Sequence, residues 1–167
     1  MYNFLCVYKF NNLFVSGFIL PRIRELLQKY RNVLTDDYCS ESFDEFLTRV
    51  QPHLYAGFMD GEFLGFVYLT DWRGGKNDYH SCTMTVCIEK KYWGKVSKEI
   101  SKLFIRKVFE HYGLFKLKAL VFEHNRNAGN FLLSLGFKKE ALLRGETVKN
   151  GKPVNMFVYS VFKEDYR

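Results

Sequence analysis

The chain of 167 residues carries 25 Lys and Arg against 18 Asp and Glu, a net charge of +7, and 18% of it is aromatic. This length predicts a single domain, residues 1–167, with a core rich in rings. The positive charge favours a polyanionic partner: nucleic acid, an anionic membrane surface or a phosphorylated cofactor. No recognised nucleic-acid-binding motif accompanies it, so we expect no specific nucleic-acid partner.

The cysteines and the first residues indicate a reducing compartment. Four cysteines stand at positions 6, 39, 82 and 87 without a CxxC pair or a metal-ligand His spacing, so we expect no metal site. Cys82 and Cys87 have opposite parity in one strand and should face opposite sides of it. Lys9 interrupts the first apolar run, and the run at 13–20 is too short to span a bilayer. We therefore expect a cytoplasmic protein with no signal peptide and no membrane interaction.

The expected secondary structure mixes strands and helices. Its elements are a strand at 2–10, a strand or an irregular segment at 13–19, helices at 21–34 and 43–50, strands at 54–58, 62–70 and 79–88, a helix at 97–112, a strand at 115–122, a short helix at 127–135, and strands at 139–148 and 154–162. Ser42 and Glu45 predict a capping box. The Asp-Gly pair at 60–61 and the Asn-Gly pair at 150–151 predict tight hairpins. One strand–helix–strand unit in an otherwise antiparallel order predicts an α/β or α+β fold with one crossover.

The turn at residues 91–97 is the most informative local feature. It follows the strand that ends at Ile88, contains Gly94 among several lysines, and leads into the most periodic helix. Free backbone N–H groups at a helix start, edged with lysines, suit a phosphate group. An ordinary strand-to-helix turn with solvated lysines is the alternative interpretation.

A second segment gives the turn a chemical meaning. Asn125, Ala128, an apolar pair at 131–132 and a Gly-Phe pair at 136–137 follow in a fixed register. With the turn, they resemble the GNAT superfamily of acetyl-CoA-dependent N-acetyltransferases. The part of the chain after the Gly-Phe pair at 136–137 resembles the ribosomal-protein-type (RimJ/RimL-like) branch of this superfamily. The resemblance implies a mixed, mostly antiparallel sheet of about seven strands, splayed between strands four and five and flanked by helices.

The resemblance also assigns residues to the cofactor. The implied contacts are Val86, Ile88, Lys91, Gly94, Lys95, Val96, Ser97, Asn125 and Phe131. In the family the turn binds the diphosphate, and the pantetheine arm lies between strands four and five. Backbone groups near Val86 and Ile88 would bond the arm, and one N–H there could stabilise the oxyanion.

Three positions depart from the family pattern. Lys91 replaces the usual Gln or Arg and keeps its polar character. Val96 stands where Gly or Ala lets the backbone approach the diphosphate, so its side chain must point away. Leu132 stands where many members carry a Tyr that protonates the leaving thiolate. Since a thiol has a pKa of about 8.5, it can leave without that acid, although more slowly.

The implied reaction is direct attack of an amine on the thioester, for which the amine must be neutral. Candidates for the base are Glu123 and His124 at the end of one strand, and His80 near the start of another. We single out Glu123 and His80 as catalytic, although each could equally be an ordinary surface residue. Tyr79, Tyr112 or Ser134 could replace the missing acid, and the spacing selects none of them.

The leading hypothesis is therefore an acetyl-CoA-dependent N-acetyltransferase acting on a peptide N-terminus or a small amine. The alternative is a catalytically weak or inactive GNAT-fold module that serves binding or assembly, as Val96 and Leu132 suggest. A basic nucleic-acid-binding domain is a third, supported by charge alone. Assembly into a homodimer is left open.

Overall fold

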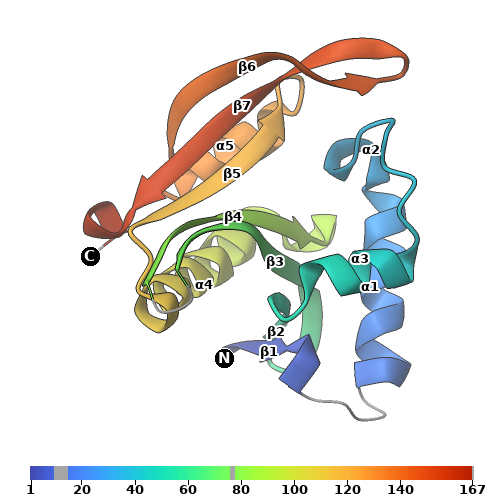
Figure 1. The fold of residues 1–167 in the computed structure, drawn as a ribbon. Coiled ribbons are helices and arrows are strands. Elements are labelled where there is room, and N and C mark those ends of the chain that lie inside the picture. Colours follow the sequence, from blue (N-terminus) through green and yellow to red (C-terminus); the bar gives the residue numbers. More distant parts are fainter. Residues whose placement is uncertain (10–14, 76–77, 167) are drawn as a thin grey trace.

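Seven strands form one sheet in the order β1-β2-β3-β4-β5-β7-β6 (Figure 1). A computed structural model describes residues 1–9, 15–75 and 78–166 of the protein. The strands are β1 (Tyr2–Cys6), β2 (Leu54–Met59), β3 (Glu62–Gly75), β4 (Asp78–Ile88), β5 (Lys116–Phe122), β6 (Lys138–Lys149) and β7 (Lys152–Phe162). The α-helices are α1 (Leu20–Lys29), α2 (Arg31–Leu34), α3 (Phe43–Val50), α4 (Lys95–Tyr112) and α5 (Arg126–Ser134). β4 and β5 pair in parallel, and the other neighbours are antiparallel, which confirms the predicted mixed fold.

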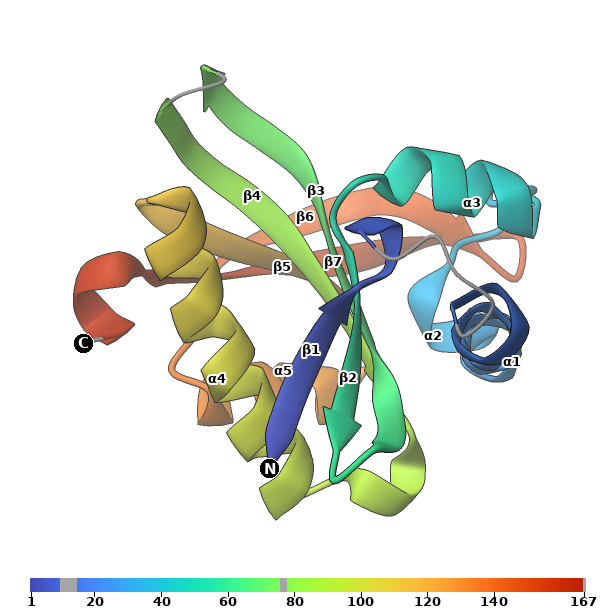
Figure 2. The ribbon, with the colours of Figure 1, turned by 90° about the horizontal axis from the view of Figure 1, so that it is seen from below.

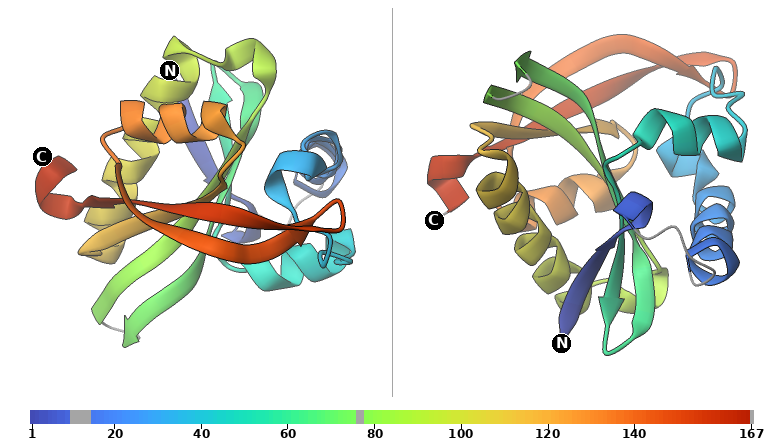
Figure 3. Two further views of the ribbon diagram at one scale, coloured as in Figure 1. Left: turned by 90° about the horizontal axis from the view of Figure 1, so that it is seen from above. Right: turned by 60° about the horizontal axis from the view of Figure 1, so that its bottom comes forward.

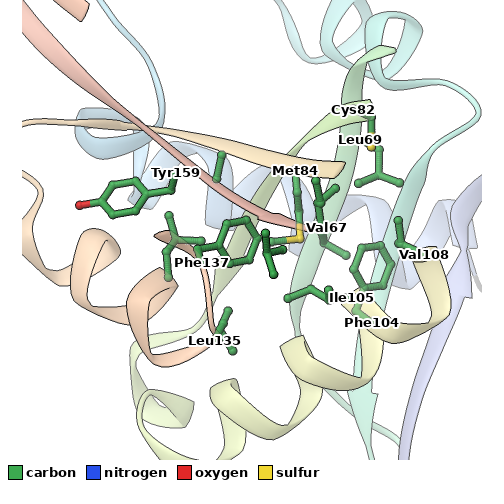
Figure 4. Packing of buried hydrophobic residues seen from close by; sticks show 14 of the residues in the cluster. Val67, Leu69, Cys82, Met84, Phe104, Ile105, Val108, Leu135, Phe137 and Tyr159 are labelled. Atoms are coloured by element: carbon green, nitrogen blue, oxygen red, sulfur yellow. The ribbon is translucent and has the colours of Figure 1, made fainter. Parts of the chain in front are cut away.

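Helices cover both faces of this sheet (Figure 2). α4 and α5 lie on one face, where α4 packs Phe104, Ile105 and Val108 against side chains of β3, β4 and β5 (Figure 4). α1 and α3 lie on the other face, over β2 and β3. Cys82 belongs to the first of these cores and Cys87 to the second, so the two thiols face opposite sides as predicted.

Local signals in the sequence set several boundaries. The capping box at α3 is formed, because Glu45 N–H donates to Ser42 Oγ at 3.2 Å and Ser42 N–H donates to Glu45 Oε2 at 2.7 Å. Both predicted hairpin turns have positive φ at each central residue, with values of 50° and 84° at 60–61 and of 53° and 70° at 150–151. That geometry fits tight turns between antiparallel strands.

The N-terminal region differs most from expectation. β1 ends at Cys6 and a 3-10 turn covers Val7–Lys9, so the strand predicted for 2–10 is too long. Residues 10–14 lie outside the described residues, and Val15–Ile19 forms a π-helical turn that runs into α1. The single helix predicted over 21–34 is interrupted at Tyr30, whose φ of −106° and ψ of 14° leave the helical region. No Gly or Pro marks this break, so the apolar periodicity alone extended the helix through it.

Other boundaries shift without changing the topology. β3 extends to Gly75, beyond the predicted end at residue 70, and α4 begins at Lys95 instead of residue 97. No helix among the described residues combines the length and the apolarity needed to cross a membrane. The same residues contain no group of three or more His, Cys, Asp or Glu side chains placed to hold a metal ion.

Candidate active site

β4 and β5 separate along their length and leave an open strand edge. Their parallel pairing runs only from Ser81↔Lys116 to Thr83↔Lys118, whereas β4 continues to Ile88 and β5 to Phe122. The β5-facing edge of β4 therefore lacks a strand partner over its last residues, as the predicted splay requires. Unpaired backbone donors and acceptors of this kind favour an extended ligand that can bond to them.

A cleft of about 890 Å³ occupies this separation. It is lined by Tyr30, Val33, Leu34, Met84, Thr85, Val86, Cys87, Ile88, Lys90, Trp93, Gly94, Ser97, Lys98, Ala119, Leu120, Val121, Asn125, Asn127, Ala128, Asn130, Phe131, Leu132 and Ser134. Because this lining includes Tyr30, which joins α1 to α2, and residues of α2 as well as of α4 and α5, the cleft reaches both faces of the sheet. We call its two ends the α4–α5 mouth and the α1–α2 mouth.

The first turn of α4 borders the α4–α5 mouth. Gly94 precedes the helix with a φ of 103° and a ψ of −125°, a conformation essentially reserved for glycine. The N–H groups of Lys95, Val96 and Ser97 follow it in the first turn, where a helix offers them no acceptor. Val96 packs its side chain against the cluster of Leu64, Tyr92 and Ile100, so it points away from this anion-accepting turn.

The backbone of β4 carries the next predicted contacts. Val86 and Ile88 both line the cleft. The indole N–H of Trp93 donates to the carbonyl oxygen of Ile88 at 2.8 Å, and Trp93 itself lines the cleft. One acceptor on the open edge of β4 is therefore occupied by a side chain of the turn. The sequence interpretation did not foresee this role of Trp93.

The lysines around the turn divide into two groups. Lys90 and Lys98 line the cleft and place positive charge beside the turn before α4. Lys91 instead bonds Glu62 Oε1 through its Nζ at 2.8 Å, and this pairing raises its pKa. Lys95 lies 3.9 Å from Glu99 with an 86% exposed side chain. The structure thus places Lys91 and the Lys95 side chain outside the lining.

The short helix α5 forms the opposite wall. Asn125 lines the cleft and caps α5, its Oδ1 accepting the N–H of Ala128 at 3.2 Å. Phe131 and Leu132 both line the cleft, and Leu132 is only 3% exposed. Leu132 therefore places an apolar side chain at the position where many members of the resembled family carry a proton-donating Tyr.

The two predicted catalytic residues lie outside the cleft lining. Glu123 is exposed at the end of β5, and its Oε2 accepts a hydrogen bond from Asn155 Nδ2 at 2.8 Å. His80 is also exposed, near the start of β4, where its ring stacks on Phe115 at 5.2 Å. The alternative base, His124, stacks on Phe122. The structure does not gather these residues with the cofactor contacts, and their catalytic role stays a prediction.

The substitutes for the missing acid are also separated. Tyr79 and Tyr112 pack against Trp72, with ring centroids 4.7 and 4.9 Å from it, in a cluster near the C-terminal end of α4. Ser134 does line the cleft, but its hydroxyl donates to the Phe131 carbonyl at 2.8 Å. Of the three candidates, only Ser134 therefore borders the cleft.

The described lining of the cleft includes a cysteine. Cys87, on β4, lines it and is 5% exposed. Burial raises the pKa of its thiol to about 12. The thiol is therefore protonated at neutral pH and is a poor nucleophile.

The α1–α2 mouth consists of residues that sequence reasoning missed. Tyr30, Val33 and Leu34 were expected only as part of the helix at 21–34, yet they line the cleft. The Tyr30 hydroxyl accepts the backbone N–H of Lys90 at 3.0 Å. This hydrogen bond ties the break between α1 and α2 to the segment that leads into α4. Only a contact between distant parts of the chain could reveal this placement.

Hydrogen bonds tie the loop after α2 to the β6–β7 hairpin. The loop after α2, residues 35–37, lies beside the tip of the β6–β7 hairpin (Figure 3). Thr147 Oγ1 donates to Asp36 Oδ2 at 2.6 Å, and Lys149 Nζ donates to the Thr35 carbonyl at 2.6 Å. Asp37 accepts the N–H of Gly151 at 2.8 Å, and this backbone bond lowers the pKa of its carboxyl. We call these contacts the hairpin clamp.

Comparison with known protein families gives one extended match. The family described as Acetyltransferase (GNAT) domain matches residues 20–158. A curated relative, the uncharacterised N-acetyltransferase YoaA of Bacillus subtilis, is 37% identical over 75 residues. That alignment spans 44% of this chain and 42% of the relative, less than half of the relative's length.

Solved structures share the fold at low sequence identity. The spermidine N-acetyltransferase of Vibrio cholerae, solved with CoA and spermine, has a TM-score of 0.77 at 18% identity, over 99% of this chain and 97% of that one. A ribosomal-protein-alanine N-acetyltransferase of Brucella melitensis has a TM-score of 0.73 at 13% identity, over 97% and 99% of the two chains. At such identities these neighbours support the arrangement of strands and helices, and nothing about the acceptor.

Proposed function

The chain belongs to the acetyltransferase (GNAT) domain family, and on this premise we propose that it transfers an acetyl group from acetyl-CoA to a primary amine, on a peptide N-terminus or a small molecule. Acetyltransferases of this family use acetyl-CoA as the donor. The observation that carries the proposal is the cleft between β4 and β5, which ends at the first turn of α4. The proposal also includes membership of the ribosomal-protein-type branch, a single domain over residues 1–167 and assembly into a homodimer.

The α4–α5 mouth suits the charged end of the donor. The N–H groups of Lys95, Val96 and Ser97 are available to diphosphate oxygens, and the helix dipole favours the negative charge there. Lys90 and Lys98 add positive charge from the cleft wall. The open edge of β4 near Val86 and Ile88 is suited to the amides of the pantetheine arm.

We infer that the amine attacks the thioester directly. The nitrogen lone pair forms the new C–N bond, the tetrahedral oxyanion accepts a backbone N–H of β4, and the C–S bond then breaks to release the CoA thiolate. The proton lost from the amine passes to solvent. Because the pKa of Cys87 is raised to about 12, a covalent acetyl-cysteine intermediate is disfavoured.

Ligand-induced stabilisation tests the donor site. At a hundredfold excess over Kd, acetyl-CoA should stabilise the protein by about 2.7 kcal/mol. Gly94→Trp should abolish this stabilisation, because a side chain at that φ strains the turn and covers its N–H groups. Gly61→Trp is a matched control, since Gly61 also has a positive φ of 84° and open space around it, but lies in the β2–β3 turn. If acetyl-CoA still stabilises Gly94→Trp, the donor site is misplaced.

A binding module without turnover is the second candidate. It is favoured by Leu132, which puts a buried alkyl group where a proton donor would help the thiolate leave. Acetyl-CoA binding without CoA release on a broad panel of amines and peptides would support the module. CoA release with any of them would support the enzyme.

A further inference from the structure

The α1–α2 mouth is apolar and lacks acidic groups. Val33 and Leu34 line it from α2, and Leu120 lines it from β5. Leu120 points away from the α4–α5 face, because its neighbours Ala119 and Val121 are buried in the core of that face. Val33 and Leu120 are 40% and 38% exposed, so both offer apolar surface to a ligand.

Charge in the cleft is entirely positive among the described lining residues. That lining contains two lysines, Lys90 and Lys98, and no Asp, Glu or His. The acidic groups nearest in sequence to the mouth each accept a hydrogen bond: Asp36 from Thr147 at 2.6 Å, Asp37 from the Gly151 N–H at 2.8 Å, and Glu123 from Asn155 at 2.8 Å. Lys149, the basic residue of the hairpin clamp, is bound to the Thr35 carbonyl. A polycationic amine would therefore meet no carboxylate among the described residues of the lining.

We propose, building on the acetyltransferase function above, that the acceptor is the α-amine of an amino acid or peptide whose first side chain is apolar, and that polyamines and lysine side chains are poor acceptors. The apolar side chain would rest on Val33, Leu34 and Leu120. The α-amine would enter between β4 and β5 already neutral, so that no base in the cleft is needed.

The size of the selection follows from the neutral fraction of each amine. An α-amine has a pKa of about 7.7–8.0 and a lysine ε-amine about 10.4, so at pH 7 the α-amine is neutral roughly 300 times more often. A general base would reduce this difference, because it would deprotonate the bound ammonium ion. In a cleft without such a base, the whole difference in neutral fraction should appear as a difference in kcat/KM.

The first experiment measures CoA release with three acceptors at pH 6.5 to 9. They are a short peptide beginning with Leu, a lysine blocked at its α-amine and carboxyl, and spermidine. We expect kcat/KM for the Leu peptide to exceed that for the blocked lysine by roughly 300-fold at pH 7. For the peptide it should rise with pH and level off at the pKa of its own α-amine.

The second experiment changes the charge of the mouth. Leu120→Glu should lower kcat/KM for the Leu peptide and raise it for spermidine, each by roughly tenfold. Leu133→Glu is the matched control: Leu133 is 49% exposed on α5 and lies outside the cleft lining. It should leave both values unchanged.

The outcomes separate this inference from the function on which it rests. A preference for spermidine or blocked lysine, or a loss of about 100-fold in kcat on Glu123→Gln, would overturn the inference and leave the acetyltransferase function intact. Equal effects of Leu120→Glu and Leu133→Glu would also overturn it. Acetyl-CoA binding with no CoA release for any acceptor would refute the acetyltransferase function itself, and this inference with it.

Discussion

The α4–α5 mouth and the α1–α2 mouth of the cleft are built in different ways. The first comes from two short segments, the turn before α4 and the start of α5, whose hydrogen bonds join residues close in sequence, such as Gly94 N–H to Ser97 Oγ at 3.1 Å. The second depends on distant partners: the hairpin clamp joins Asp36 to Thr147, and Tyr30 meets the turn at Lys90. The local mouth carries backbone donors and lysines, whereas the mouth built from distant contacts is apolar. The two mouths can therefore be tested separately by substitution.

The largest expected effect is on stability, and it comes from the close backbone contact between β3 and β4. A Cβ on Gly65 would lie 2.1 Å from the Cys87 carbonyl oxygen, a backbone atom of β4. Gly65→Ala should cost about 3 kcal/mol of unfolding free energy and lower Tm by roughly 6–12 °C. In Gly57→Ala, the control, the nearest atom to the Cβ is the flexible Ile100 Cδ1 at 3.1 Å, and the others lie at 3.4 Å or more. Equal melting temperatures for the two variants would contradict this prediction.

Lysine substitutions test which positive charges contribute to acetyl-CoA binding at the α4–α5 mouth. Lys90→Gln combined with Lys98→Gln should weaken acetyl-CoA binding by about 30-fold at low salt, and by less at high salt, because both side chains line the cleft. Lys91→Gln and Lys95→Gln should change the affinity little, since those ammonium groups pair with Glu62 and Glu99. Titration calorimetry at two salt concentrations measures both pairs. A larger loss from the second pair would reverse the assignment.

Loosening the hairpin clamp should affect the acceptor alone. Thr147→Val removes the hydroxyl that bonds Asp36 at 2.6 Å but keeps the shape of the side chain. We expect the acceptor KM to rise about fivefold, as for the loss of one hydrogen bond of about 1 kcal/mol. The Kd for acetyl-CoA should stay the same. A parallel change in both constants would mean that the two mouths are not independent.

Freeing one backbone acceptor should have the smallest effect. Trp93→Phe keeps a ring in the cleft but removes the N–H that donates to the Ile88 carbonyl at 2.8 Å. If the pantetheine arm uses that carbonyl, acetyl-CoA should bind up to about threefold more tightly. Weaker binding would show instead that the indole positions the turn for the donor. Equilibrium titration against the parent protein distinguishes the two results.

Sequence reasoning worked where a short segment fixes its own geometry. The glycine turn, the capping box at Ser42 and the two hairpins were all predictable, because each depends on residues within a few positions of one another. The contacts that the family resemblance implied at Val86, Gly94, Asn125 and Phe131 also line the cleft. The same reasoning extended one helix through Tyr30, since an apolar period carries no information about a break that a tertiary contact holds.

From the sequence alone followed the order of strands and helices, the single crossover and the turn at the start of α4, because periodicity and turn chemistry are local properties of the chain. The tertiary structure alone decided which side chains face the cleft: it directed Lys91 to Glu62, placed Glu123 and His80 outside the lining, and brought Val33 and Leu34 into it. These choices depend on the packing of segments far apart in the chain, whose relative positions no local pattern encodes.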